Sequence, residues 1–273
     1  MSAYFDEIDV RCLAQTRVNR EAVTTWLEVL GADEFILPPE DQVADPALLV
    51  ALAAKQCYMS FQPGMNPNVT KIRQDMVEYL DNILKQRHGS VLEHAVFTFG
   101  VNGCSRVFTA EMNRHRAGVA ISERSMRYIR YDTIHYWMPE CFRPAEGDSD
   151  ETLAKKLQSR IVLNETFNEQ ERAMGKFTRI WADELANGPF HQKKTLTSAF
   201  RRPIGMGIAT GGIWTMNVRS LRHIIALRTD EGAEEEAIHI CRKIGLYMME
   251  ELPELFSDFK DNGKSLIPSF WKV

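Results

Sequence analysis

The chain has 273 residues, of which 44% are hydrophobic and 26% are charged, and its formal net charge is −4. This composition is ordinary for a globular protein with a proper core, and the negative net charge argues against a general nucleic-acid binder. The first residues lack the basic and apolar regions of a secretory signal, and no apolar run approaches the roughly 18 residues that span a bilayer. The five cysteines are dispersed, with no CxxC pair and no zinc-like spacing. We therefore expect a cytoplasmic protein with reduced thiols and no metal, and with no membrane or nucleic-acid polymer as its partner.

The first part of the chain alternates helical patterns with turns. The helix that ends at Gly31 has a typical C-terminal glycine, and the next one begins at Pro46, a residue favoured in a first helical turn. Apolar residues recur at helical spacing in the third helix. Residues 95–101 are β-branched and aromatic, which predicts a strand. Helices are predicted over residues 19–31, 46–57, 68–86 and 104–113.

The second part of the chain is also mainly helical. A long helical stretch is predicted over residues 150–186, broken by Gly188-Pro189. Residues 213–228 begin as a strand and become a helix, and residues 233–252 form a further amphipathic helix before Pro253. No internal repeat or low-complexity linker divides the chain. We predict one α+β domain over residues 1–273 in which helices dominate.

Residues 114–128 form the most unusual segment. It contains four arginines, a histidine, a glutamate and two serines, with no aliphatic helical stripe. A solvated helix face would mix in lysine at regular spacing, whereas arginine offers a planar fork of donors to a phosphate or carboxylate. The segment is interpreted as an oxyanion-binding site, most plausibly for nucleotide phosphates. The alternative is an arginine-rich surface loop with internal ion pairs.

Other chemical signatures are weak when each is taken alone. The glycine-rich residues 205–212 fit neither a dinucleotide fingerprint nor a phosphate loop, so we expect flexible backbone or close packing there. Cys57 lies on the apolar side of its predicted helix and is expected to be a buried small residue, not a nucleophile. Singly, Ser60 is explained as a turn residue, His88 as a partner of a helix C-terminus and Asn217 as a helix cap.

Taken together in their order, however, five blocks resemble the flavin-dependent thymidylate synthases over roughly residues 45 to 260. The blocks are His88-Gly89-Ser90-x-x-Glu93-His94-x-x-Phe97-x-Phe99, Arg114-His115-Arg116, Glu123-x-Ser125-x-Arg127-Tyr128, Asn217-x-Arg219-Ser220-Leu221 and Leu227-Arg228. The resemblance implies a helix-rich α+β domain with a central antiparallel or mixed sheet. It also implies an FAD-containing homotetramer whose active sites are shared between subunits.

The activity implied by the resemblance is methylation of C5 of dUMP. The one-carbon unit would come from methylenetetrahydrofolate, and the reducing equivalents from NADPH through the flavin. No enzymic nucleophile is needed, because the cofactor supplies the difficult chemistry. The residues implied to bind the flavin are Ser60, His88, Ser90, Glu93, Arg114, His115, Arg116, Asn217, Arg219 and His223.

The same resemblance implies a nucleotide site and a small catalytic set. Serine and arginine side chains are suited to a phosphate dianion, and a guanidinium near the uracil carbonyls would stabilise the negative charge that the ring gathers during reaction. We expect Arg228, His88 and Ser125 to be catalytic. The residues implied to bind the substrate are Glu111, Glu123, Ser125, Arg127, Arg201, Arg202 and Arg228.

The chain departs from the family pattern around the substrate segment. Six residues, 117–122, separate Arg116 from Glu123 where the family usually has five, and Glu111 stands where the family has a glutamine. A longer segment containing Gly118 could move aside for a ribose 2′-hydroxyl or accept it with its backbone, and Glu111 is an alternative acceptor. We therefore expect an atypical branch that resembles the UMP C5-methylase of polyoxin biosynthesis. The rival is a non-catalytic flavin- or nucleotide-binding homologue.

Overall fold

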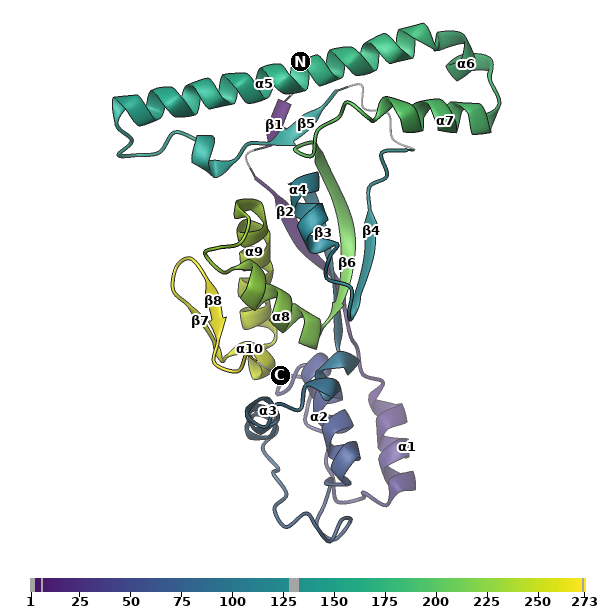
Figure 1. The fold of residues 1–273 in the computed structure, drawn as a ribbon. Coiled ribbons are helices and arrows are strands. Elements are labelled where there is room, and N and C mark those ends of the chain that lie inside the picture. The colour runs from purple at the N-terminus through teal and green to yellow at the C-terminus, as the bar shows by residue number, and fades with distance from the viewer. Residues whose placement is uncertain (1–2, 6, 128–132, 272) are drawn as a thin grey trace. The chain divides into compact units, whose positions relative to one another are not determined.

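The computed structural model describes residues 3–5, 7–127, 133–271 and 273. The chain divides into two compact units (Figure 1). Unit 1 contains residues 1–11, 100–114 and 121–213, and unit 2 contains residues 12–99, 115–120 and 214–273. The expected organisation as one domain over residues 1–273 stays a prediction.

A four-stranded antiparallel sheet confirms the predicted mixture of helices with a central sheet. Its strand order is β2-β3-β6-β4. In each of these strands the chain passes from one unit to the other. The bounds are β2 Asp9–Gln15, β3 Val96–Ser105, β4 Val119–Glu123 and β6 Ala209–Asn217.

Unit 2 surrounds its share of the strands with helices. The helix α8 packs against α9 so tightly that a Cβ atom on Gly245 of α9 would lie 2.9 Å from Ile225 of α8. Figure 1 shows these two helices side by side, with the β7–β8 hairpin next to them. The bounds are α1 Arg20–Leu30, α2 Asp45–Tyr58, α3 Met76–Lys85, η1 Gly89–His94, α8 Val218–Arg228, α9 Glu235–Glu251, α10 Pro253–Phe256, β7 Phe259–Asp261 and β8 Leu266–Pro268.

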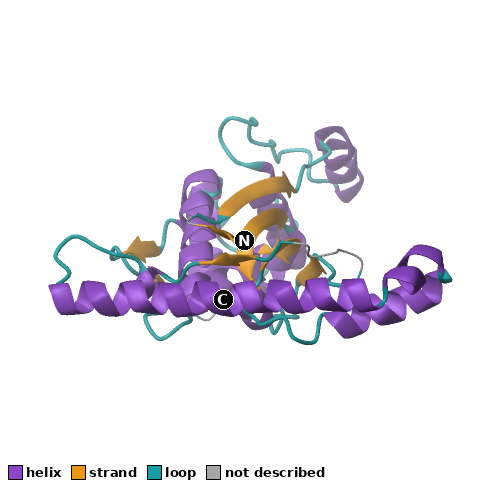
Figure 2. Cartoon of the chain, turned by 90° about the horizontal axis from the view of Figure 1, so that it is seen from above, coloured by secondary structure: helices purple, strands orange, loops and turns teal. Residues whose placement is uncertain are grey.

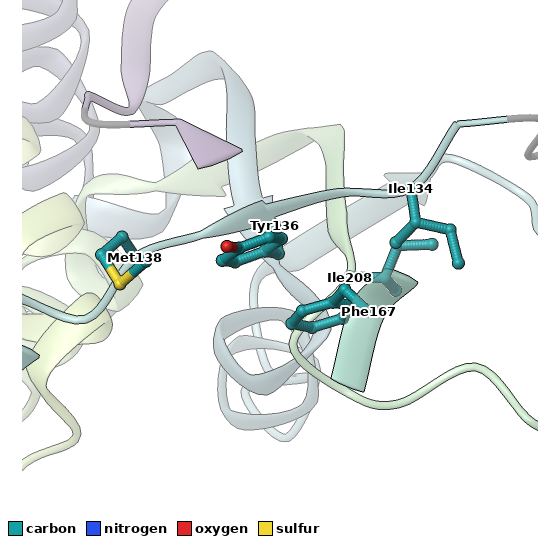
Figure 3. Close-up of a cluster of buried hydrophobic side chains, with 5 residues drawn as sticks. All are labelled: Ile134, Tyr136, Met138, Phe167 and Ile208. Carbon is teal, nitrogen blue, oxygen red and sulfur yellow. The ribbon is translucent and has the colours of Figure 1, made fainter. Parts of the chain in front are cut away.

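Unit 1 is built on one long helix, α5, which crosses the whole view of Figure 2. Phe167 of α5 stacks on Tyr136 of β5 with ring centroids 4.4 Å apart, in a buried cluster with Ile134, Met138 and Ile208 (Figure 3). The strand β1 pairs with β5 in parallel. The bounds are α4 Arg106–Met112, α5 Asp150–Ile180, α6 Ala182–Asn187, α7 Phe190–Phe200, η2 Glu140–Phe142, β1 Ala3–Phe5 and β5 His135–Trp137.

Most predicted elements are confirmed, and one helix is wrong at its start. The helix predicted over residues 68–86 begins only at Met76, because the Asp75 side chain caps it by accepting from the Glu78 amide at 2.8 Å. The glycine-rich run serves close packing: a Cβ on Gly207 would lie 2.8 Å from the Phe167 ring. No helix in the described ranges is both long enough and apolar enough to cross a membrane.

Candidate functional site

The segment around His88 and Gly89 is the first part of the candidate site in unit 2. His88 follows α3 and precedes η1, and its Nδ1 lies 2.9 Å from the Tyr58 hydroxyl at the end of α2. Gly89 is buried, and a Cβ there would lie 2.3 Å from the backbone of Val273 and 2.9 Å from Nε of Arg219. This position therefore accepts only glycine, which lets other groups approach the backbone closely.

The first turn of α8 contacts η1, which follows this segment, through an ion pair. Arg219 Nη1 donates to Glu93 Oε1 at 2.7 Å, and Arg219 Nε donates to the Val273 carbonyl at 3.2 Å. Both members of the pair are about half exposed, so solvent screens their attraction. The pair nevertheless brings together two residues implied to bind the flavin that lie 126 positions apart.

Asn217 caps α8 and is itself held by the arginine-rich segment. Its side chain accepts from the Ser220 amide at 2.8 Å, and its own amide donates to the Gly118 carbonyl at 3.0 Å. The Ser220 hydroxyl donates to the Ala117 carbonyl at 2.6 Å. Gly118 has a φ of 66°, and a Cβ there would lie 2.3 Å from Asn217. The backbone of Ala117 and Gly118 is therefore bonded to the start of α8, and the expectation that the segment can move aside stays a prediction.

Arg228, at the end of α8, is oriented by a histidine of the arginine-rich segment, residues 114–128. Its Nε donates to His115 Nε2 at 2.9 Å. An imidazole nitrogen that accepts this bond is unprotonated, so in a neutral ring the proton is on Nδ1. The His115 ring also lies edge-on to the exposed His223 ring, with centroids 6.0 Å apart. Three residues implied to serve the site thus meet in unit 2.

Ser60 presents a buried hydroxyl that is poorly satisfied. Only 7% of the residue is exposed, and its Oγ makes no hydrogen bond of normal geometry with a described residue, although the Tyr79 hydroxyl lies near enough to interact with it. It directly follows Met59, whose positive φ of 45° ends α2. A buried hydroxyl without a partner is unfavourable unless a ligand satisfies it.

In unit 1, Glu123 is held by donors from α4. Its carboxylate accepts from Thr109 Oγ1 at 2.9 Å and from Asn113 Nδ2 at 3.1 Å, and it pairs with Arg106 at 3.0 Å. These contacts occupy the carboxylate and fix β4 against α4. The substrate-binding role expected for Glu123 stays a prediction.

The other expected phosphate residues lie beside one another in unit 1. The Ser125 hydroxyl accepts from the Arg127 amide at 3.2 Å, which makes a serine turn. The Arg127 carbonyl in turn accepts from Thr197 Oγ1 at 3.3 Å. Thr197 lies in the last turn of α7, which ends directly before Arg201, the half-buried neighbour of the exposed Arg202. The turn therefore contacts the last part of α7, four positions before Arg201.

The remaining predicted residues are less engaged. Arg114 belongs to unit 1, is largely exposed and lies 3.6 Å from Glu111, whereas the chain enters unit 2 at the next residue. Arg116 and Ser90 are exposed. Tyr128, part of the third sequence block, lies outside the described residues.

The two residue sets thus separate between the units. Of the residues implied to bind the flavin, Arg114 alone belongs to unit 1, and of those implied to bind the substrate, Arg228 alone belongs to unit 2.

The expectation that Cys57 is buried is wrong, because it faces solvent on α2. Sequence reasoning also missed Tyr58 and Lys55. Lys55 stands in the apolar stripe of α2, three positions after Leu52, and this placement of a charge was a usable signal.

The residues in unit 2 fit a flavin cofactor. The buried hydroxyl of Ser60 can accept or donate one hydrogen bond, whereas the backbone at Gly89 is already covered by Val273 and Arg219. The start of α8, with Arg219 in its first turn, is a favourable environment for anionic phosphates.

Comparison with known proteins agrees with this chemistry. Residues 40–254 match the model of the family described as thymidylate synthase complementing protein. A flavin-dependent thymidylate synthase of Mycobacterium sp. (strain JLS) is 30% identical over 252 residues, which cover 88% of this chain and 92% of that protein. The corresponding protein of Mycobacteroides abscessus is 29% identical over 248 residues, covering 88% of this chain and 91% of its own.

Solved structures show the same fold. The crystal structure of the UMP/dUMP methylase PolB from Streptomyces cacaoi, bound with 5-Br UMP, superposes with a TM-score of 0.61 at 15% sequence identity. The similarity covers 94% of this chain and 95% of PolB. With the family model matching most of its length, the chain belongs to the thymidylate synthase complementing protein family, the family of the flavin-dependent thymidylate synthases.

Proposed function

We propose that the chain is a flavin-dependent C5-methyltransferase of uridine 5′-monophosphates. The carbon donor is methylenetetrahydrofolate, and NADPH supplies reducing equivalents through FAD. The observation that supports this best is the meeting of distant segments in unit 2, where Arg219 pairs with Glu93 and Arg228 with His115. The family membership and the fold shared with PolB, a UMP/dUMP methylase, agree with it.

The flavin is proposed to lie beside Ser60 and the start of α8. Ser60 would satisfy its buried hydroxyl on the cofactor, and Arg219 would exchange part of its present pairing for the flavin phosphates. When bound, the flavin supplies the hydride chemistry that no side chain can supply. The protein's own contribution is to bind and orient the reacting groups.

Arg228 is proposed to act on the pyrimidine. Its Nε is committed to His115, which fixes the plane of the guanidinium. A fixed positive charge near the uracil carbonyls stabilises the negative charge that gathers on the ring when a nucleophile or hydride adds at C6. His88, held by the Tyr58 hydroxyl, and Ser125 complete the proposed catalytic set.

The nucleotide phosphate is proposed to bind in unit 1. Arg127 and the arginine pair after α7 supply positive charge, and Ser125 supplies a hydroxyl. Glu111 remains a candidate acceptor for a ribose hydroxyl. Relatives with a shorter segment would leave that hydroxyl buried and unpaired, at a cost of roughly 1–3 kcal/mol. In this chain an acceptor removes that cost, so kcat/KM for UMP should lie within about tenfold of that for dUMP.

Assembly as a homotetramer with shared active sites, in the cytoplasm, is part of the proposal. It rests on the family resemblance. Light scattering tests the tetramer, and an active monomer at assay concentration would refute shared sites.

The test of the function is an assay of the purified protein with C5-tritiated UMP and dUMP, methylenetetrahydrofolate, NADPH and FAD. We expect a flavin absorption band and tritium release from both nucleotides. A flavin band without tritium release would favour the rival, a non-catalytic flavin- or nucleotide-binding homologue. Rejection of UMP by a thousandfold would contradict the substrate proposal alone.

A further inference from the structure

We propose that Lys55 is a positioning residue of the flavin site, which holds the Ser60 turn through its buried ammonium group. The chain keeps this charge for cofactor binding and not for stability. The inference rests on the proposed role of Ser60 as a flavin-binding residue.

The environment of Lys55 is unusual for a lysine. The residue is 1% exposed, on the face of α2 that also buries Leu48 and Leu52. Its ammonium lies 4.4 Å from the centre of the Tyr79 ring and 5.3 Å from that of Phe35. No ion pair with a carboxylate of the described residues is found for it, and both of its side-chain hydrogen bonds go to backbone carbonyls. A buried lysine is rarely left without an acidic partner, so these contacts require an explanation.

The contacts of the ammonium group provide it. Nζ donates to the Ser60 carbonyl at 3.4 Å and to the Arg73 carbonyl at 3.2 Å. These carbonyls lie near the two ends of the loop that connects α2 with α3, residues 59–75. One ammonium group therefore links the two ends of this loop by hydrogen bonds. The Ser60 amide also donates to the Lys55 carbonyl at 3.0 Å. The lysine therefore fixes the backbone on either side of the buried Ser60 hydroxyl, next to Tyr79.

The energetic balance points to function. Burial lowers the pKa of Lys55 to about 8, so folding disfavours the charged ammonium that links the two ends of the loop. A methionine of similar length would fill the same space between Tyr79 and Phe35 without this penalty. Residues that weaken the folded state and yet form specific contacts are expected at binding sites, where stability is exchanged for activity.

The test compares Lys55→Met with Lys85→Met, a control that removes a half-exposed lysine on α3. The dissociation constant for FAD is measured by fluorescence titration, and the urea midpoint is measured on the flavin-free proteins, since bound ligand would itself stabilise them. We expect Lys55→Met to weaken FAD binding fivefold or more while its urea midpoint stays the same or rises. We expect the control to bind FAD as the wild type does.

Two results would overturn the inference. One is FAD binding by Lys55→Met within less than fivefold of the wild type. The other is weaker binding that comes with a lower urea midpoint, since this pattern marks a merely structural residue. If the wild-type protein itself binds no FAD, the proposed function fails, and this failure is distinguished by the first titration.

Discussion

The buried ion pair between Arg222 and Asp258 should dominate the stability of unit 2. Arg222 Nη1 and Nη2 donate to the two Asp258 oxygens at 2.7 and 2.9 Å, and both side chains are less than 10% exposed. Arg222 also donates to the carbonyls of Leu255 and Phe270 and stacks over the Phe259 ring at 4.9 Å. One guanidinium therefore ties α8 to the C-terminal segment.

Asp258→Asn removes the negative charge and leaves the arginine buried. Breaking a buried pair from one side costs about 3–5 kcal/mol, because the remaining charge is uncompensated. The backbone carbonyls still accept from Arg222, but the asparagine amide nitrogen replaces one carboxylate oxygen and faces a donor of Arg222. We therefore expect a loss of about 3–5 kcal/mol, out of the roughly 5–15 kcal/mol typical of folded proteins.

Urea denaturation with an unchanged m-value measures this loss. The matched control is Asp261→Asn, because Asp261 makes the same bidentate geometry with Arg242 at 2.7 and 2.8 Å but is partly exposed. Solvent screens that pair, so its loss should be much smaller. Equal losses in the two variants would refute the argument that burial decides the effect.

Two further predictions use matched pairs. Gly118→Ala should destabilise the protein more than Gly31→Ala. Both glycines have φ near 67°, so an alanine at either position costs about 1–2 kcal/mol of strain, but of the two only Gly118 has a neighbour, the Asn217 side chain, within 4 Å of a new Cβ. Equal melting temperatures of the two variants would contradict the packing argument. Hydrogen bonds from the Lys156 ammonium and a backbone amide lower the pKa of Asp148, so its stabilisation is present above the ordinary aspartate range near 4 and is lost as the pH falls through the lowered value. Lys156→Met should therefore reduce the fall in melting temperature between about pH 7 and about pH 3, whereas the same change at the exposed Lys155 should not, and identical acid profiles would show that this pair contributes nothing.

The secondary structure could be predicted where single residues punctuate the chain. Gly31 ends α1 with a φ of 67°, Pro46 lies in the first turn of α2, and Gly188 separates α6 from α7. The three-residue strands β1, β5, β7 and β8 were not predicted, because they are too short to show an alternating pattern, and the longer strands β2 and β4 were missed as well. The pairing of β1 with β5 joins segments more than a hundred positions apart, whereas β7 and β8 form a local hairpin.

The sequence by itself determined which residues are expected at the site and their order along the chain, because the ordered blocks resemble those of the flavin-dependent thymidylate synthases. Only the tertiary structure decided which of them meet. The pairs of Arg219 with Glu93 and of Arg228 with His115 join residues 126 and 113 positions apart, and no local pattern encodes such contacts. Burial is decided in the same way: Cys57 and Lys55 lie two positions apart on one helix, yet packing against Phe35 and Tyr79 buries the lysine and leaves the cysteine in solvent.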